Sequence, residues 1–360
     1  MKIAKEHGIT PSDTTITTGN PVFLDVTKPP FRLYGLYEPF RRVPEAVAKA
    51  TSKSVENLAP MTAGVRLRFS TDSDYIVIHA EIVGTDKNPQ SPEIMARGFE
   101  LYQKENDTYR FLGLMIPSQG EGKNYVESRV RLAAGKKDII IGFPHFAKIA
   151  SVSVALREGS ELDEGGAYRY PKPIVFYGSS IVQGTGAGRP GSHYAAIIAR
   201  RLDSDFINLG FGGAAKAEPA IMDYIAGLDM SVFVYDYDHN APDAEYLKNT
   251  HYEGYRRFRA VQPDTPVIMA SKVDYHSDAE TNETRRRIVM ESYKRGLEAD
   301  DRHLYFVDGS KVFPSDYRDE CSADGCHPND VGYLAMADAI GKAVKKALEE
   351  RNTEGADGNA

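Results

Sequence analysis

Residues 173–180 read PIVFYGSS, an apolar run that ends in a glycine and two serines. A short apolar run bounded by turn-forming residues is typical of a buried strand. Gly178 permits backbone angles that other residues avoid, so a serine that follows it can stand at the mouth of a sheet. The stretch therefore predicts a buried strand whose end presents a hydroxyl group.

The rest of the C-terminal half repeats this pattern. Further apolar strands are expected at residues 206–211, 232–235, 267–270 and 304–307. Helical patterns separate or follow these strands at residues 193–202, 218–228, 243–261, 283–297 and 330–350. Strands that alternate with helices indicate a parallel sheet with helices on both faces. We therefore predict an α/β domain with a flavodoxin-like, doubly wound parallel sheet.

The N-terminal half has a different pattern. Short runs alternate apolar and polar residues, as at residues 64–69 and 75–82, and turn-forming residues separate them. Many short strands without intervening helices are typical of an all-β sandwich or jelly roll. Residues 158–166 are acidic, glycine-rich and aperiodic, as linkers are. The predicted organisation is a β-sandwich domain at 1–160, a linker at 161–172, the α/β domain at 173–350 and a polar, disordered tail at 351–360.

Composition narrows the class of protein. The net charge of -7 argues against nucleic acid or an anionic membrane surface as the main partner. The N-terminus has no secretory signal pattern and no stretch approaches a membrane span, which favours a cytoplasmic protein. Cys321 and Cys326 are close enough in sequence for a local disulfide, although cytosolic thiols are more often reduced. Two cysteines make a poor zinc site, so neither a metal nor a cofactor is expected.

Polar and small residues follow the ends of the predicted parallel strands, where ligands bind in such sheets. Ser180 follows the first strand, Gly212 and Gly213 the second, Asn240 the third, and His327 lies beyond the fifth. Since the carboxyl ends of parallel strands share one edge of the sheet, we expect these residues to be neighbours. This edge is the predicted site.

The stretch at 324–329, DGCHPN, places an aspartate three residues before a histidine in a turn bounded by glycine and proline. Asp324 can hold one imidazole nitrogen of His327 while the other takes a proton from Ser180, which are the parts of a serine hydrolase. Each residue also has a structural interpretation. Ser180 can cap a helix, His327 can be a loop histidine, and Asp324 can cap the last helix, although Asn329 or Asp330 is better placed for that.

Cys326 is a rival nucleophile next to His327, but adjacent residues rarely direct their side chains to one point. Asp238 and His239 form a second Asp/His pair, and neighbours on an extended segment point in opposite directions. We interpret that pair as supporting or packing groups.

The glycines after the second strand suit an oxyanion site. Backbone N–H groups of Gly212 or Gly213 can approach an oxyanion without steric hindrance, and Asn240 offers a neutral side-chain donor. The alternative is close packing of strand against helix. Residues 186–191, GAGRPG, match G-x-G-x-x-G, but they follow the strand too late and lack a ribose-binding acid, so a loop near the substrate is favoured. The stretch at 31–42 is rich in aromatic and basic residues, which suit either the binding of sugars or packing between the two predicted domains.

These motifs, in this order and spacing, resemble the four blocks of the SGNH, or GDSL, hydrolase superfamily over residues 172–348. The resemblance implies Ser180 as nucleophile, His327 as base and Asp324 as the residue that orients it. It implies an oxyanion hole made of the backbone N–H groups of Ser180 and Gly213 and the side chain of Asn240. Ser179 stands where the family usually has aspartate, and Gly212 where a small hydroxyl residue is common, so the assignment between Gly212 and Gly213 stays open.

Residues 98–102, GFELY, resemble the N-terminal module of two-domain bacterial SGNH esterases. Several of those look like carbohydrate esterases, with the acetylmannan esterases of carbohydrate esterase family 17 as the nearest suggestion, and their sandwich module is similar to carbohydrate-binding modules. The resemblance implies deacetylation of mannan- or xylan-derived oligosaccharides. An acyltransferase, or a carbohydrate-binding protein with a silent hydrolase domain, is the alternative. The expected partner is an acetylated oligosaccharide, and neither nucleic acid nor a membrane is expected as a partner. The sequence leaves open whether the chain forms a homo-oligomer.

Overall fold

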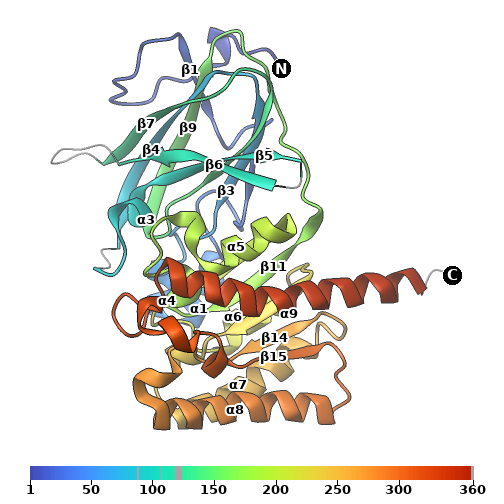
Figure 1. Cartoon of the computed structure of the whole chain (residues 1–360). Coiled ribbons are helices and arrows are strands. Elements are labelled where there is room, and N and C mark those ends of the chain that lie inside the picture. The colour runs from blue at the N-terminus through green and yellow to red at the C-terminus, as the bar shows by residue number, and fades with distance from the viewer. Residues whose placement is uncertain (87–88, 107, 118–123, 358–360) are drawn as a thin grey trace. The chain divides into compact units, whose positions relative to one another are not determined.

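The computed structural model describes residues 1–86, 89–106, 108–117 and 124–357 (Figure 1). These residues form two compact units. The first contains residues 1–42, 60–168 and 188–191, and the second contains the other described residues. None of the helices in the described ranges is both long and apolar enough to cross a membrane.

The first unit is built from two antiparallel sheets. One sheet has the strand order β1 (Pro21–Asp25), β9 (Ala147–Arg157), β4 (Tyr75–Thr85), β7 (Tyr125–Arg131). The other has the order β10 (Leu162–Asp163), β3 (Arg66–Thr71), β8 (Lys137–Gly142), β5 (Phe99–Glu105), β6 (Thr108–Met115), with β2 (Arg32–Tyr34) paired to β3. A short helix, α3 (Glu93–Arg97), precedes β5.

The core of this unit follows the alternation in the sequence. Ile76, Ile78, Ala80 and Ile82 of β4 lie in one buried cluster, as their period of two requires, together with residues of β3 such as Phe69. The predicted all-β sandwich is therefore confirmed. Part of the aromatic stretch at 31–42 also serves this core, since the buried Phe31 ring packs edge-on against Phe69.

The segment predicted as a linker is partly held in place. Leu162 and Asp163 pair with β3 as β10, and the Glu161 N–H donates to Asp72 Oδ1 over 2.7 Å. The acidic composition of this segment indicates solvent exposure. The pairing of residues 162–163 depends on their contact with β3, which composition does not reveal.

The second unit contains a five-stranded parallel sheet. Its strand order is β12 (Ser204–Gly210), β11 (Tyr170–Gly178), β13 (Val232–Asp236), β14 (Val267–Ala270), β15 (Leu304–Val307). This is the order of the flavodoxin-like sheet. All five strands were expected from the apolar runs, and the predicted fold class is confirmed.

Helices cover both faces of the parallel sheet. Figure 1 shows α5 (Tyr194–Leu202) and α9 (Asp330–Asp357) on one side, and α7 (Ala244–Arg259) and α8 (Ala279–Glu298) on the other. The apolar face of α6 (Pro219–Ala226) packs with that of α7 in a buried cluster that also includes residues of β11 and β13. The short α4 (Ser180–Gln183) begins directly after β11. Further 3-10 helices are η1 (Lys5–His7), η2 (Pro190–Ser192), η3 (Asp238–Asn240), η4 (Tyr275–Asp278), η5 (Gly309–Lys311), η6 (Ser315–Tyr317) and η7 (Asp319–Cys321).

Two helices that were not expected from the sequence belong to the second unit. They are α1 (Glu45–Thr51) and α2 (Lys53–Leu58), within the range predicted for the sandwich domain. Ser52 separates them and accepts the Val55 N–H at the start of α2. Val43, Ala48 and Val55 are fully buried in the core of the second unit. Such short helices carry too few turns for a clear helical period in the sequence.

The C-terminal helix α9 extends to Asp357, beyond the predicted end at residue 350. The predicted disordered tail therefore differs from the structure over residues 351–357, while residues 358–360 lie outside the described residues. Arg351 donates to the Ser231 carbonyl over 2.9 Å, which continues the helix against the sheet.

Candidate active site

The predicted site residues follow the carboxyl ends of the parallel strands. Ser180 begins α4 after β11, Gly212 and Gly213 follow β12, Asn240 ends η3 after β13, and His327 lies in the loop before α9. The structure therefore brings residues from four separate parts of the sequence to one edge of the sheet.

The turn after β11 depends on Gly178. A β-carbon there would lie 1.8 Å from the Asp236 carbonyl oxygen of the neighbouring strand, so no other residue fits without moving β13. Ser179, and not Ser180, caps the helix that follows, because its Oγ accepts the Ile181 N–H over 3.1 Å. The Ser180 hydroxyl is thereby left to interact outside its own helix.

Ser180, His327 and Asp324 form one hydrogen-bonded chain. Ser180 Oγ lies 3.0 Å from His327 Nε2, and His327 Nδ1 lies 2.8 Å from Asp324 Oδ2. The side chains of His327 and Asp324 are 19% and 25% exposed, so the pair is shielded but reachable from solvent. The geometry fits transfer of the Ser180 proton to an imidazole whose other nitrogen is held by a carboxylate.

The loop that carries His327 is stabilised by its own polar groups. Asp324 Oδ1 accepts the backbone N–H groups of Cys326 and His327 over 2.9 and 2.7 Å. Ser322 Oγ donates to the His327 carbonyl over 3.0 Å. Burial opposes ionisation of Asp324, but hydrogen bonds from the His327 backbone and ring outweigh burial and lower the pKa of the carboxyl. Asp324 is therefore a carboxylate over the neutral pH range.

Helix α9 attaches this loop to the serine turn. Asn329 Oδ1 accepts the Val331 N–H over 3.0 Å, which is the helix-capping role expected for Asn329 or Asp330. The Tyr333 hydroxyl contacts two carbonyls near Ser180, those of Ile181 and Thr185, at 3.0 and 2.7 Å. A β-carbon on Gly186 would lie 2.4 Å from the Pro328 carbonyl oxygen, so the two loops approach each other directly.

The candidate oxyanion donors are arranged differently from the expectation. The Gly213 N–H donates to Asn240 Oδ1 over 3.0 Å, and the Gly212 N–H donates to Gln183 Oε1 over 2.9 Å. Both glycine N–H groups are thus directed at side-chain oxygens. Asn240 Nδ2 donates one hydrogen to the Phe211 carbonyl over 2.9 Å, and an amide nitrogen carries a second. The Ser180 N–H lies in the first turn of α4, where backbone N–H groups have no acceptor within their own helix.

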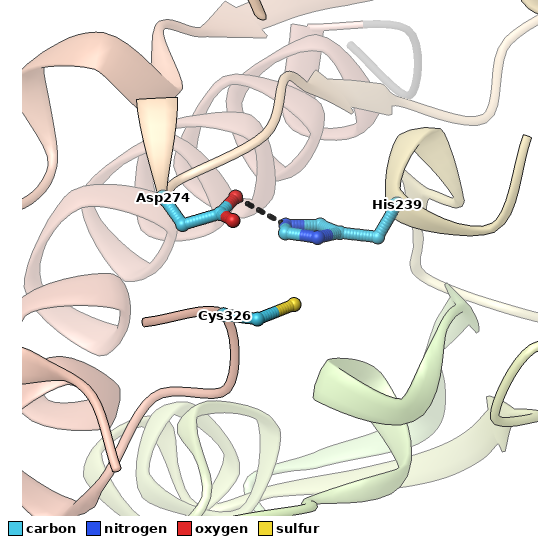
Figure 2. A group of neighbouring side chains, drawn as sticks. All are labelled: His239, Asp274 and Cys326. Atoms are coloured by element: carbon cyan, nitrogen blue, oxygen red, sulfur yellow. Dashed lines mark ion pairs between the residues drawn. The ribbon is translucent and has the colours of Figure 1, made fainter. Parts of the chain in front are cut away.

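The second Asp/His pair separates into two interactions. Asp238 is fully buried and bonds Arg285, with Arg285 Nε 2.8 Å from Asp238 Oδ1. His239 instead faces Asp274, with Nε2 3.5 Å from Oδ1 (Figure 2). Burial, with Lys272 adding to it, lowers the pKa of His239 to about 3, so its imidazole is neutral. The expectation that Asp238 and His239 point apart is thus met.

Cys326 lies beside His239 and Asp274 (Figure 2). Burial raises the pKa of the Cys326 thiol to about 11, and the charge of Asp274 acts in the same direction. Such a thiol is a poor nucleophile at neutral pH. Cys321 and Cys326 are both free thiols.

A buried carboxyl group underlies the site at the end of β13. The Tyr194 hydroxyl donates to Asp236 Oδ2 over 2.9 Å. Burial raises the pKa of Asp236 to about 8, despite that hydrogen bond, and the charge of Asp238 adds to the rise. The sequence did not single out Asp236, Gln183, Arg285 or Asp274, because their roles depend on contacts between distant segments.

The stretch at 186–191 is divided between the two units, since residues 188–191 belong to the first. Arg189 belongs with the first unit, where its Nη1 lies 2.5 Å from Glu100 Oε2 and also bonds the Tyr102 hydroxyl. Glu100 and Tyr102 belong to the GFELY stretch of β5. This stretch therefore has a structural role that its sequence alone did not reveal.

Comparisons with known proteins cover both units. Residues 171–345 match the profile of the GDSL-like lipase/acylhydrolase family. Residues 25–162 match the GxDLY family, described as the N-terminus of SGNH hydrolase-type esterases. No significant match was found among curated proteins.

Several solved structures are similar over most of the chain. A Bacteroides ovatus protein described as a GDSL-like lipase is 25% identical, with a TM-score of 0.83 over 92% of this chain and 98% of its own. A salicylyl-acyltransferase from a tetracycline biosynthetic pathway is 21% identical, with a TM-score of 0.73 over 89% and 95%. An acetyl xylan esterase from the rumen bacterium Butyrivibrio proteoclasticus is 11% identical, with a TM-score of 0.57 over 92% and 99%.

The similarity to the salicylyl-acyltransferase and to the acetyl xylan esterase, which are 21% and 11% identical to this chain, shows a shared fold. The two family profiles follow one another along nearly the whole chain, and the second of them covers the five-stranded parallel sheet. This chain therefore belongs to the GDSL-like lipase/acylhydrolase family, the SGNH hydrolases, and is a carboxylic ester hydrolase.

Proposed function

We propose that the chain is a serine esterase that removes O-acetyl groups from oligosaccharides derived from plant mannan or xylan. The observation that carries the proposal is the hydrogen-bonded chain from Asp324 through His327 to Ser180. The choice of acetylated sugars is supported by the shared fold of acetyl xylan esterase and the family two carbohydrate esterases.

The reaction begins with Ser180. Its Oγ attacks the ester carbonyl carbon while His327 Nε2 takes the hydroxyl proton, and the carbonyl oxygen becomes an oxyanion. Asp324 holds the imidazolium that forms, through Nδ1. His327 then gives its proton to the leaving sugar oxygen, which breaks the ester bond and leaves an acetyl-Ser180 intermediate. Water, deprotonated by His327, attacks the carbonyl carbon of this intermediate; His327 then returns the proton to Ser180 Oγ as the acyl–oxygen bond breaks and acetate leaves.

The oxyanion is held by the Ser180 N–H and by the second N–H of Asn240 Nδ2. One N–H of Asn240 Nδ2 donates to the Phe211 carbonyl, and Asn240 Oδ1 accepts the Gly213 N–H. The amide group is therefore held on both sides. Gly213 thus serves as a positioning residue for Asn240 in this arrangement. Preorganised donors of this kind cost no reorganisation when charge develops.

The test is acetate release from acetylated manno- and xylo-oligosaccharides. Wild type should release acetate, and Ser180→Ala should not. Ser179→Ala is the matched control, because it removes the neighbouring hydroxyl and only the helix cap, which typically costs about 1 kcal/mol of stability. Equal acetate release by wild type and Ser180→Ala would overturn the role of Ser180. Hydrolysis of long-chain esters without any release of acetate would overturn the choice of substrate.

A second candidate is acyl transfer, favoured by the similarity to the salicylyl-acyltransferase. The same acyl-Ser180 intermediate would then react with an acceptor hydroxyl, with His327 removing the acceptor proton. The ratio of transferred to released acyl groups distinguishes the two, measured with and without added oligosaccharide acceptor. A yield of transfer product that exceeds acetate at millimolar acceptor would favour the transferase.

A further inference from the structure

The strongest feature outside the proposed reaction is a cluster of three potential metal ligands. One ring nitrogen of His239, one carboxylate oxygen of Asp274 and Cys326 Sγ all lie within 4.8 Å of one another. Figure 2 shows that all three side chains point into one space, each from a separate segment. His239 comes from η3, Asp274 from the turn before η4, and Cys326 from the loop before α9.

Two of these residues each have a buried polar atom without a hydrogen bond. His239 and Asp274 have side chains only 6% and 4% exposed. Among the described residues, neither His239 Nε2 nor Asp274 Oδ1 has a hydrogen-bond partner, although the two atoms face each other at 3.5 Å. Leaving buried polar atoms without a partner costs free energy, so this pair would gain from a group that both atoms can bind.

The spacing fits a small ion with tetrahedral coordination. Nitrogen and oxygen ligands lie about 2.0–2.2 Å from zinc, so two of them in a tetrahedral site lie roughly 3.3–3.6 Å apart. The 3.5 Å between His239 Nε2 and Asp274 Oδ1 falls in this range. A zinc–sulfur bond of ~2.3 Å places the sulfur roughly 3.5–3.7 Å from the other two ligand atoms, and the Cys326 sulfur lies within about 1.3 Å of that spacing.

The ligand types select the metal. One thiol, one imidazole and one carboxylate suit Zn²⁺, whereas Ca²⁺ and Mg²⁺ prefer oxygen ligands only. The opposing feature is Lys272, whose Nζ lies 3.2 Å from Asp274 Oδ2. Lys272 engages Oδ2 and leaves Oδ1, the oxygen that faces His239, so its charge weakens the site without occupying the ligand atom.

We propose that His239, Asp274 and Cys326 bind one Zn²⁺ ion, with a water molecule as the fourth ligand. The thiol proton passes to solvent when the zinc–sulfur bond forms. Cys326 directly precedes His327, and His239 directly precedes Asn240. A bound ion therefore links the segment of the proposed base to that of the proposed oxyanion donor.

The first experiment is a titration with Co²⁺, which reports a thiolate ligand through a charge-transfer absorption band. Wild type should develop the band with one equivalent bound, and Zn²⁺ should displace it. Cys321→Ser is the matched control, since it removes the other free thiol and should keep the band. Cys326→Ser should lose it. Absence of the band in wild type at millimolar Co²⁺ would overturn the proposal and does not depend on any variant folding.

The second experiment distinguishes a three-ligand site from a metal held by one thiol. Alkylation of Cys326 by iodoacetamide, followed by mass spectrometry, should slow at least tenfold in wild type when Zn²⁺ is added. His239→Gln and Asp274→Asn keep the thiol, and each should shift the Zn²⁺ concentration needed for protection upward at least tenfold, as loss of a metal-binding partner does. His251→Gln, a buried histidine outside the cluster, is the control. Equal protection in wild type and His239→Gln would show that the imidazole does not bind the ion.

Discussion

The Gly213 N–H donates to Asn240 Oδ1 over 3.0 Å, and this bond orients the amide of Asn240 toward its other partners. It links the loop after β12 to η3. The amide oxygen is therefore used for orientation, while the amide nitrogen is the donor available to an oxyanion. Replacements at Asn240 can separate these two roles.

Asn240→Ala should lower kcat by about 10²–10³, the typical cost of one oxyanion donor. Asn240→Asp keeps an oxygen for the Gly213 N–H but replaces the donor by a negative charge, so it should lower kcat at least as much. Both variants should keep KM within a few fold. Steady-state kinetics on an acetyl ester are the measurement. Full activity in Asn240→Asp would contradict the assigned donor.

Asp324→Asn should lower kcat by about 10⁴, because an amide favours the wrong tautomer of His327 in such triads. The lowered pKa of Asp324 also sets a pH dependence. A carboxyl whose folded-state pKa is depressed stabilises the fold above its unfolded pKa, roughly 3.9, and that contribution is lost as pH falls through the folded value. The unfolding free energy of wild type relative to Asp324→Asn should therefore decrease only below about pH 4. A constant difference from pH 7 to pH 2.5 would contradict this linkage.

Asp236→Asn should stabilise the protein at alkaline pH. Burial raises the pKa of Asp236 to about 8, so the folded state keeps a proton that the unfolded chain loses above about pH 4. The stability of wild type then falls with rising pH between these values, by about 1.4 kcal/mol per pH unit for one group. Asparagine stays neutral and can accept from the Tyr194 hydroxyl.

The measurement for Asp236 is urea unfolding of both proteins at pH 5 and pH 9. The variant should gain relative to wild type at pH 9. If the difference between the two proteins is the same at both values, Asp236 does not hold its proton in the folded state.

Arg285→Met should destabilise the protein by roughly 3–5 kcal/mol, because it leaves Asp238 buried without its cation. Arg302→Met is the matched control. Its partner is Asp300, and both side chains are more than 80% exposed, so its loss should cost less than about 1 kcal/mol. Thermal or urea unfolding compares the two. Similar costs for both replacements would show that the buried pair has no special contribution.

The parts of the site that could be predicted are those with local signals. Asp324 and His327 lie three residues apart in one turn, and Ser180 directly follows a strand that its apolar run indicates. The order of the parallel strands follows from general rules for alternating strands and helices. Neither prediction needs knowledge of distant contacts. The catalytic roles of the three residues stay predictions until the variants are measured.

The parts that could not be predicted depend on side-chain orientation across segments. Nothing near His239 in the sequence indicates Asp274 or Cys326 as its neighbours. Likewise the direction of the Gly213 N–H depends on where the Asn240 amide lies. The helices α1 and α2 were missed because their apolar residues pack into a core made mostly by residues more than a hundred positions later.

The placement of α1 and α2 has a consequence for dividing the chain. A fragment that begins near residue 169 would contain the whole parallel sheet but would lack Val43, Ala48 and Val55, which are fully buried in its core. Burying one valine contributes on the order of 1.5–3 kcal/mol, a large share of the stability of an ordinary domain. Conversely, residues 188–191 of the first unit are encoded within the second. A single cut at the acidic segment therefore yields two incomplete pieces. Either unit could be exchanged in evolution only if residues 43–59 and 188–191 were moved together with the units to which they belong.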